Sequence, residues 1–160
     1  MEQTQRKINS RIGPLYLVAS EKGLQGVFWT KQRSPMATDE SERKSLILKK
    51  AELQLEEYLS GKRKDFDLPL DPRGTKFQKR VWEQLTKIPY GGTRSYKEIA
   101  KALNQEGASR AVGSANGQNP LSIIVPCHRV ISSNGSLGGY AGGLGIKETL
   151  LNLEKKGCPH

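Results

Sequence analysis

The residues best suited to chemistry in this chain are a cysteine, a histidine and an arginine in direct succession, Cys127, His128 and Arg129. The thiolate of cysteine is the nucleophile, and nearby cationic or basic groups increase the thiolate fraction at neutral pH from an ordinary pKa of about 8.5. The apolar residues 123–125 predict a buried strand, and Pro126 removes a backbone donor and ends that strand. The pattern therefore places a thiol at a strand end, beside an imidazole and a guanidinium.

Two interpretations of Cys127 stay open on these residues alone. A lone thiol is commonly a buried structural residue, whereas the neighbouring imidazole and guanidinium favour a reactive one. Adjacent side chains point to opposite faces of a strand, or about 100° apart on a helix, and do not easily bond each other. If His128 is the base for Cys127, we expect a water between them and a third group that holds the imidazole.

A carboxylate near the end of the sequence is the candidate for that third group. Residues 146–156 predict a helix whose core face includes Leu150, and Glu154 falls on the same apolar face. A carboxylate is costly to bury without a partner, so we expect Glu154 to bind His128. A surface ion pair with a lysine is the alternative.

The length and the rare residues limit the kind of protein. A chain of 160 residues can form one domain or two small lobes. Because it has no run of about 18 apolar residues and no apolar stretch at its start, we expect neither a membrane span nor a signal peptide, and a cytoplasmic location. We expect Cys127 and Cys158 to be free thiols. His128 and His160 are the only histidines, too few for a closed zinc site.

The charge suggests a polyanionic partner. The formal net charge is +10 and the isoelectric point is about 9.7. Residues 75–160 hold 12 Lys and Arg against 5 Asp and Glu, a net of +7, whereas residues 1–74 hold 14 against 11, a net of +3. The excess therefore lies in the half that contains Cys127, although a generally basic protein would show a similar total.

The first half of the chain predicts a small lobe of strands and one helix, residues 1–72. Residues 13–19 and 24–29 are apolar segments joined by a hairpin-like turn. Residues 44–60 have a helical pattern, and residues 66–70 suggest an edge strand. No chemistry is evident in this lobe.

The second half, residues 73–160, predicts a mostly helical domain, which makes the fold class α+β. One helix is expected at about residues 75–88. A capping box of Ser95 and Glu98 begins the next helix, and a polar turn at 104–107 separates it from a helix at about 108–116. Two short helices with such a turn fit a helix-turn-helix, winged-helix-like domain, although ordinary helical domains share the spacing.

The helix at 108–116 has a face without bulky side chains. From Arg110 this face runs through Gly113, Ser114 and Gly117. Close packing of helices is the ordinary use of such a face, but the projecting arginine favours approach to DNA. Since only Asn116 and Gln118 lie nearby to recognise base edges, we expect contacts to the backbone and shape of DNA with little sequence specificity.

The glycine-rich residues 135–145 predict a loop rather than a regular element. Tyr140 within it favours a pocket wall over a flexible connector. Together with the segments above, this loop makes the second half resemble the O6-alkylguanine-DNA alkyltransferases over about residues 74–156, and the first lobe resembles them only in coarse pattern. The resemblance is carried by Pro126-Cys127-His128-Arg129-Val130, Arg110-Ala111-Val112-Gly113, Asn119-Pro120, Ser95-Tyr96, Tyr140-Ala141-Gly142-Gly143-Leu144 and Leu150-Leu151-Asn152-Leu153-Glu154.

The resemblance implies a single irreversible transfer of the alkyl group from O6-alkylguanine, and from O4-alkylthymine, to Cys127. His128, through a water, would keep the thiol deprotonated, Glu154 would hold His128, and Asn119 would brace the active-site turn. The base would be extruded from the duplex to reach the thiol. The implied base-binding residues are Tyr96, Val130, Tyr140, Ala141 and Lys147.

The resemblance also implies a monomer that binds the minor groove of double-stranded DNA and uses neither cofactor nor metal. The implied DNA-binding residues are Arg110, which would fill the gap in the base stack, Ser95, Gly113 and Ser114. Position 141 is alanine where some members of the family have serine, which leaves only a backbone contact there. The alternatives are a non-catalytic protein that binds alkyl lesions, a class that resembles this chain but lacks the cysteine, a Cys-His hydrolase, and a helix-turn-helix regulator.

Overall fold

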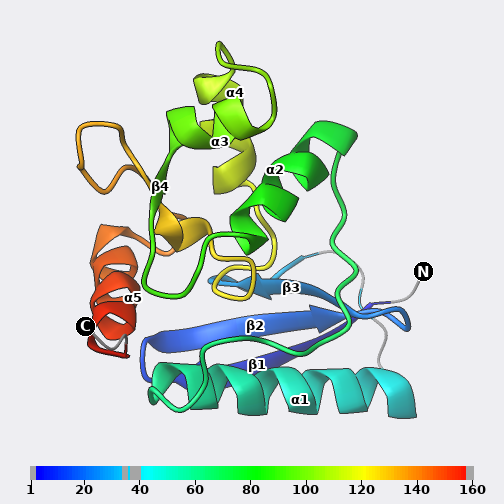
Figure 1. Ribbon diagram of the computed structural model, residues 1–160. Helices are drawn as coiled ribbons and strands as arrows, with labels where there is room; N and C mark the ends of the chain where they lie inside the picture. The colour runs from blue at the N-terminus through cyan, green and yellow to red at the C-terminus, as the bar shows by residue number, and fades with distance from the viewer. Residues whose placement is uncertain (1–2, 34–35, 37–40, 158–160) are drawn as a thin grey trace. The chain divides into compact units, whose positions relative to one another are not determined.

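A computed structural model describes residues 3–33, 36 and 41–157, and the chain divides into two compact units, Met1–Arg73 and Gly74–His160 (Figure 1). The first unit holds a sheet and one helix, and the second is mostly helical, so the predicted mixed fold class is confirmed. Cys158 and His160, about which the sequence also made predictions, lie outside the described residues. No helix in the described part of the chain combines the length and apolar character needed to cross a membrane.

The sheet of the first unit is antiparallel, in the order β1 (Thr4–Ser10), β2 (Gly13–Ala19), β3 (Leu24–Phe28). The predicted hairpin of β2 and β3 is confirmed, with a register shift at Val18/Ala19. Strand β1 was not predicted from the sequence. Only Thr4 and Ile8 of its residues are buried, so the strand carries too few apolar residues to stand out.

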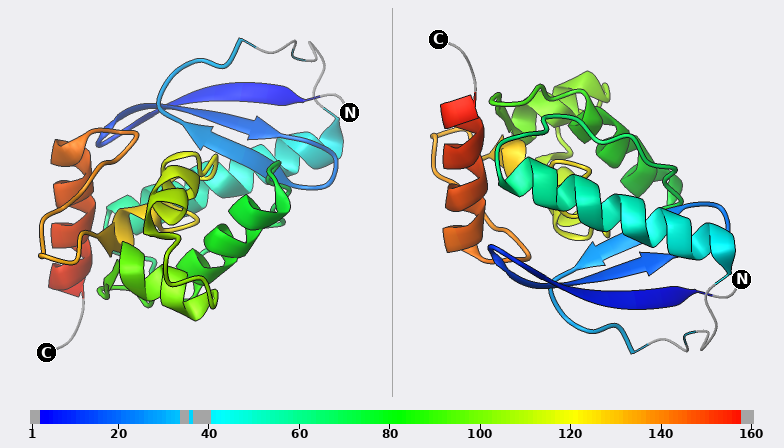
Figure 2. Two further views of the ribbon diagram at one scale, coloured as in Figure 1. Left: turned by 90° about the horizontal axis from the view of Figure 1, so that it is seen from above. Right: turned by 90° about the horizontal axis from the view of Figure 1, so that it is seen from below.

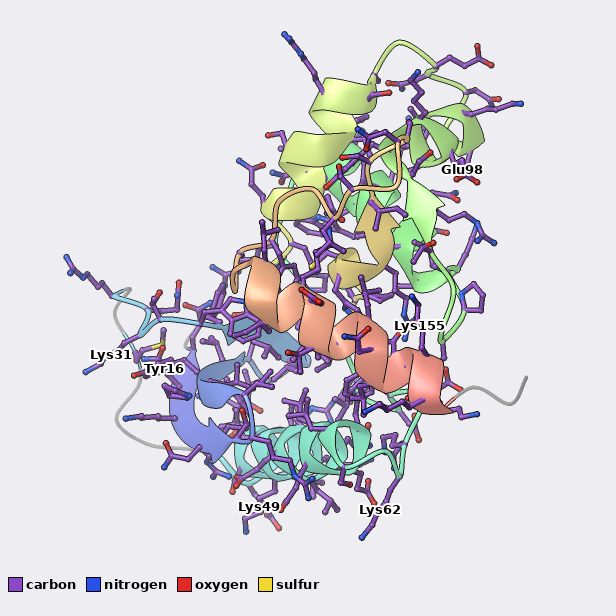
Figure 3. The ribbon with its side chains drawn as sticks, turned by 90° about the vertical axis from the view of Figure 1, so that its left-hand side faces the viewer. Tyr16, Lys31, Lys49, Lys62, Glu98 and Lys155 are labelled. Carbon is purple, nitrogen blue, oxygen red and sulfur yellow. The ribbon has the colours of Figure 1, made fainter. Side chains whose placement is uncertain are left out.

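Helix α1 (Glu42–Leu59) covers one face of this sheet (Figures 1 and 2). The hydroxyl of Ser41 caps it by accepting the Lys44 amide at 3.1 Å. Its buried stripe includes Leu48 and Leu55, whereas Lys49 points away from the sheet (Figure 3). The helix therefore contributes the core of the unit from one side and a charged surface from the other.

The predicted edge strand at residues 66–70 is wrong. Among the described residues it is reduced to a single parallel bridge between Leu24 and Leu70. The Leu24 amide donates to the Pro69 carbonyl, and the Asp71 amide donates to the Leu24 carbonyl, each at 2.8 Å. Pro69 has no amide hydrogen, so a continuous ladder cannot form through it.

The second unit contains the predicted helices. They are α2 (Lys76–Thr86), α3 (Tyr96–Ala102), α4 (Ser109–Gly117) and α5 (Leu144–Gly157). The capping box at the start of α3 is confirmed, since Ser95 accepts the Glu98 amide at 3.0 Å and Glu98 accepts the Ser95 amide at 3.0 Å. α3 and α4 pack against each other as a helix-turn-helix, and the turn between them contains Asn104 at φ 58°.

Two short strands that the sequence did not predict connect this helical pair to the cysteine segment. β4 (Arg94–Ser95) precedes α3, and β5 (Val130–Ile131) follows the cysteine segment. They pair in parallel, with Arg94 opposite Val130. A strand of two residues carries no sequence period, which explains why the pattern did not reveal it.

Candidate active site

The cysteine segment is a turn and not the end of a strand. Residues 122–125 form turns, with Ile123 at φ 74°, and Cys127–Arg129 form a single turn of 3₁₀ helix, η1. The predicted strand at 123–125 is therefore wrong, although its three residues are buried as expected. In a helix of three residues per turn, consecutive side chains point about 120° apart, so the thiol, imidazole and guanidinium diverge.

Asn119 explains why this apolar segment turns. Its amide nitrogen donates to the Val125 carbonyl at 2.9 Å, and its amide oxygen accepts the Leu121 amide at 3.0 Å. The side chain thus supplies the bonds that a neighbouring strand would supply. A non-glycine residue in the left-handed region costs about 1–3 kcal/mol, so Ile123 is held in its conformation by these contacts.

The buried carboxylate of Glu154, on α5, connects the 3₁₀ turn to the rest of the second unit through hydrogen bonds. Its Oε2 lies 2.7 Å from His128 Nε2 and accepts a hydrogen bond from Arg129 Nη2 at 2.9 Å, and its Oε1 accepts one from Arg129 Nε at 2.8 Å. The Gly91 amide adds a fourth bond, at 3.2 Å. The carboxylate is fully buried, so a surface pair with a lysine is excluded and the partner expected from sequence is present.

Arg129 is a site residue that the sequence analysis did not assign. Besides its two bonds to Glu154, its Nη1 donates to the Ile88 carbonyl at 2.8 Å, and its guanidinium lies 5.7 Å from the Tyr90 ring centre. Its position next to His128 in the sequence could have indicated a role in the site, but the direction of its side chain depends on the 3₁₀ turn. It supplies the charge that balances Glu154.

The imidazole of His128 is neutral at pH 7. Burial lowers its pKa below the ordinary 6.5 and the charge of Arg129 adds to this, although the hydrogen bond and charge of Glu154 act in the opposite direction. An ionised carboxylate can only accept hydrogen bonds, so the imidazole proton is on Nε2. The Nδ1 atom is then the basic nitrogen of the site.

The thiol of Cys127 is also neutral in this structure. Burial raises its pKa, while a hydrogen bond from Asn119 and the charge of Lys147 partly offset that rise. The direction is opposite to the one expected from the basic neighbours in the sequence. Cys127 is 4 % exposed, and the low polarity around it outweighs those neighbours. Deprotonation is therefore part of a reaction and not a property of the resting site.

Lys147 of α5 fastens the glycine-rich loop. Its ammonium group, fully buried, donates to the carbonyls of Val130 at 2.6 Å, Leu137, and Gly139 at 3.3 Å. Burial lowers its pKa to about 8. The resemblance assigns the backbone of Val130 to the base, and the carbonyl of that backbone accepts this bond. Lys147 and Val130, both assigned to the base pocket, are therefore bonded to each other.

Two tyrosines complete the surroundings of the thiol. Burial raises the pKa of Tyr96 and raises that of Tyr140 well above 10, and the negative charge that Cys127 carries once it is a thiolate adds to both shifts. Tyr96 also lies against the loop, because a Cβ added at Gly138 would be 2.8 Å from its hydroxyl oxygen. Ala141, in contrast, is exposed. The structure thus brings both phenols close to Cys127.

The residues assigned to DNA lie at the start of α3 and on α4. Arg110 and Ser114 are exposed, Ser95 caps α3, and a Cβ at Gly113 would be 3.7 Å from the Tyr96 ring. Asn116 differs from its expectation. It is 4 % exposed and donates to the Cys127 carbonyl, so it cannot recognise a base edge.

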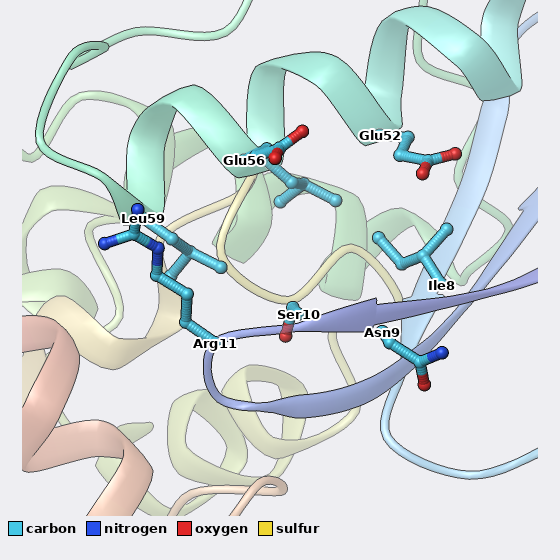
Figure 4. Close-up of a pocket in the computed structure, with 8 residues that line it drawn as sticks. Ile8, Asn9, Ser10, Arg11, Glu52, Glu56 and Leu59 are labelled. Carbon is cyan, nitrogen blue, oxygen red and sulfur yellow. The ribbon is translucent and has the colours of Figure 1, made fainter.

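A separate pocket in the first unit lies between β1 and α1 (Figure 4). Its volume is about 130 Å³, and its charged lining residues are Glu52, Glu56 and Arg11. Cysteine and histidine are absent from its lining. In the described part of the chain, no three His, Cys, Asp or Glu side chains are grouped to hold a metal ion.

Comparisons with known proteins agree with this site. Residues 5–72 match the ribonuclease-like domain of 6-O-methylguanine DNA methyltransferase, and residues 76–156 match its DNA-binding domain. The methylated-DNA–protein-cysteine methyltransferase of Methanosarcina barkeri is 53% identical over 150 residues, covering 92% of this chain and 94% of the relative. That of Mycobacterium tuberculosis is 47% identical over 154 residues, covering 96% and 93%.

Solved structures give the same result. The crystal structure of Mycobacterium tuberculosis OGT in complex with DNA has a TM-score of 0.87 and 46% identity, and the match covers 98% of this chain and 95% of that one. An O6-methylguanine DNA methyltransferase from Methanococcus jannaschii has a TM-score of 0.70 and 29% identity, covering 97% and 96%. This chain is similar to both over nearly its whole length.

Proposed function

Because the chain belongs to the 6-O-methylguanine DNA methyltransferase family and repairs alkylated DNA by transfer to a cysteine, we propose that Cys127 is that cysteine. The observation that carries the proposal is the buried network around it. Cys127 is the only cysteine among residues 3–33, 36 and 41–157, and it adjoins an imidazole held at 2.7 Å by Glu154.

The reaction is a single displacement. A bond forms between the Cys127 sulfur and the alkyl carbon, and the bond from that carbon to guanine O6 breaks with its electron pair remaining on oxygen. The thiol proton passes through a water toward Nδ1 of His128, and guanine takes up one proton, so the transfer is balanced. Nothing in this scheme cleaves the thioether, and each molecule therefore acts once.

The neutral resting site fits this sequence of events. A buried neutral thiol beside a neutral imidazole holds the one proton that must move, and Asn119 and Lys147 stabilise the thiolate as it forms. Glu154 and Arg129 form a charge-balanced pair that keeps the imidazole in the tautomer with a basic Nδ1. Catalysis is then assigned to Cys127, His128, Glu154 and Asn119.

The base pocket is formed by the loop and the two tyrosines. A guanine in the stack cannot present its O6 substituent in line with a thiol, so the nucleotide is extruded, at a cost of about a few kcal/mol. The raised pKa values of Tyr96 and Tyr140 keep their hydroxyls as donors. The backbone of Val130 and Ala141 and the loop fastened by Lys147 complete the pocket, which would also take O4-alkylthymine.

DNA binds through α4 in the minor groove. The exposed Arg110 enters the stack in place of the extruded base, and Ser95, Gly113 and Ser114 allow close approach of the backbone. The burial of Asn116 removes one side chain that could select bases, which supports binding with little sequence specificity. The protein acts as a monomer, in the cytoplasm with its DNA substrate, and needs no cofactor.

The alternative is a protein that binds alkyl lesions without reacting. Intact-mass spectrometry after incubation with duplex O6-methylguanine DNA distinguishes the two, because transfer adds one methyl group, located on Cys127. Cys127→Ser abolishes the mass increase and leaves DNA binding nearly intact. An unmodified wild-type protein, or a methyl group on another residue, would refute the proposal.

A further inference from the structure

Asn116 has a buried side chain whose hydrogen bonding is incomplete. It lies in the last turn of α4, is 4 % exposed, and donates through Nδ2 to the Cys127 carbonyl at 3.3 Å. Its Oδ1 is buried and accepts no hydrogen bond in the described part of the protein. Leaving such an acceptor unsatisfied costs about 1–3 kcal/mol, a cost that an apolar side chain of the same shape would not carry.

The carbonyl that Asn116 holds is a sensitive one. Cys127 O also accepts the Val130 amide, the bond that closes η1. The Asn116 amide is thus a second donor on the same oxygen, and it fixes the peptide plane between Cys127 and His128. Because the thiol and the imidazole project from the two ends of this plane, the plane sets the direction of both.

The amide itself is firmly placed. Trp82 Nε1 donates to the carbonyl of Ala115, the residue before Asn116, at 2.8 Å, which fastens the end of α4 to α2. Three residues further on, Asn119 holds the Val125 carbonyl at 2.9 Å. Two asparagines therefore hold the backbone on either side of Pro126. Asn119 holds the Val125 carbonyl, and Asn116 holds the Cys127 carbonyl.

We propose that Asn116 is a positioning residue for alkyl transfer, which holds the Cys127 carbonyl and thereby aims the thiol, at a cost in stability. This inference rests on the proposed function of Cys127. It assigns to α4 a second task besides DNA contact, since the same helix carries the exposed Arg110 at its start and the buried Asn116 at its end.

The test compares Asn116→Leu, which keeps the shape and removes both amide atoms, with Asn152→Leu, which alters an exposed asparagine on α5. The quantities are the single-turnover rate of methyl transfer at saturating duplex, the Kd for that duplex, and the thermal midpoint. We expect Asn116→Leu to lower the rate about 10- to 100-fold, the loss typical of a misplaced reacting group. The Kd should not change, and the midpoint should stay equal or rise.

A rate equal to that of wild type would overturn the proposal, and so would a rate loss accompanied by a fall in the thermal midpoint. Asn116→Ala cannot overpack the site and should show the same loss of rate if the leucine variant does not fold. These outcomes are separate from failure of the proposed function, which would appear as an absence of methyl on wild-type Cys127.

Discussion

Replacing Glu154 by glutamine should leave the buried positive charge of Arg129 without its ion-pair partner. The carboxylate accepts bonds from His128, from Arg129 twice and from Gly91, and its exposure is 0% while that of the Arg129 side chain is 8%. Removing one member of a buried ion pair costs about 3–5 kcal/mol. At about 2–4 °C per kcal/mol for a chain of this length, the thermal midpoint should fall by about 6–20 °C.

Glutamine at position 154 also changes which nitrogen of the His128 imidazole carries the proton. If its amide group faces His128 Nε2, the imidazole proton moves to Nδ1 and the basic nitrogen toward Cys127 is lost. A comparable change in a serine protease triad lowers the rate about 10⁴-fold, and we expect a loss of at least about 100-fold in single-turnover transfer. The assay measures methyl on Cys127 over time, at a temperature below the midpoint of the variant.

A double-mutant cycle with Arg129→Met tests the reasoning. If the cost comes from the unpaired charge, the double variant Glu154→Gln/Arg129→Met loses at least about 2 kcal/mol less than the sum of the single variants. Glu148→Gln, on the exposed face of α5, is the matched control and should change stability by less than about 0.5 kcal/mol. Additive losses, or a Glu154→Gln variant as stable as the control, would refute the account.

Three further predictions concern pH, the loop and DNA. The single-turnover rate should be flat from about pH 6.5 to about pH 8 and should fall below about pH 6.5. Across the flat range the imidazole of His128 is neutral, because its pKa is lowered, and Lys147, with a pKa of about 8, loses its proton only above this range. A rate that climbs tenfold per pH unit across this range would show that His128 does not take the proton. Gly138→Ala should destabilise the protein by about 1–3 kcal/mol and slow transfer, because the site has φ 71° and the new methyl meets Tyr96, whereas Gly135→Ala, at φ 87° in open space, should show the backbone cost alone in denaturant unfolding. Arg110→Ala should slow transfer from duplex DNA more than transfer from the free base, and an equal loss on both substrates would count against its entry into the stack.

Local rules of sequence predicted the elements that depend on local chemistry. The Ser95 and Glu98 pair predicts the start of α3, and an acidic residue on an apolar face predicts that Glu154 has a buried partner. These inferences succeed because a cap is complete within four residues and a buried charge needs a partner whatever the fold.

The missed features depend on side chains that lie outside the segment whose structure they determine. An apolar, β-branched run such as 123–125 predicts a strand, and only the side chain of Asn119 makes a turn the lower-energy solution. The sequence likewise shows the basic neighbours of Cys127 but not its burial, which decides the direction of its pKa. The roles of Arg129 and Asn116 depend on where a 3₁₀ turn and the end of α4 point them.

The burial of the neutral thiol also bears on how long one molecule lasts before it meets damage. Peroxides, disulfides and small electrophiles react with exposed thiolates. Cys127 is 4 % exposed and its pKa is raised, so these reagents meet neither a thiolate nor an accessible sulfur. In a protein that can act only once, the thiol therefore stays unreacted in the presence of competing oxidants. Selectivity for the lesion then begins with chemical inertness toward everything else.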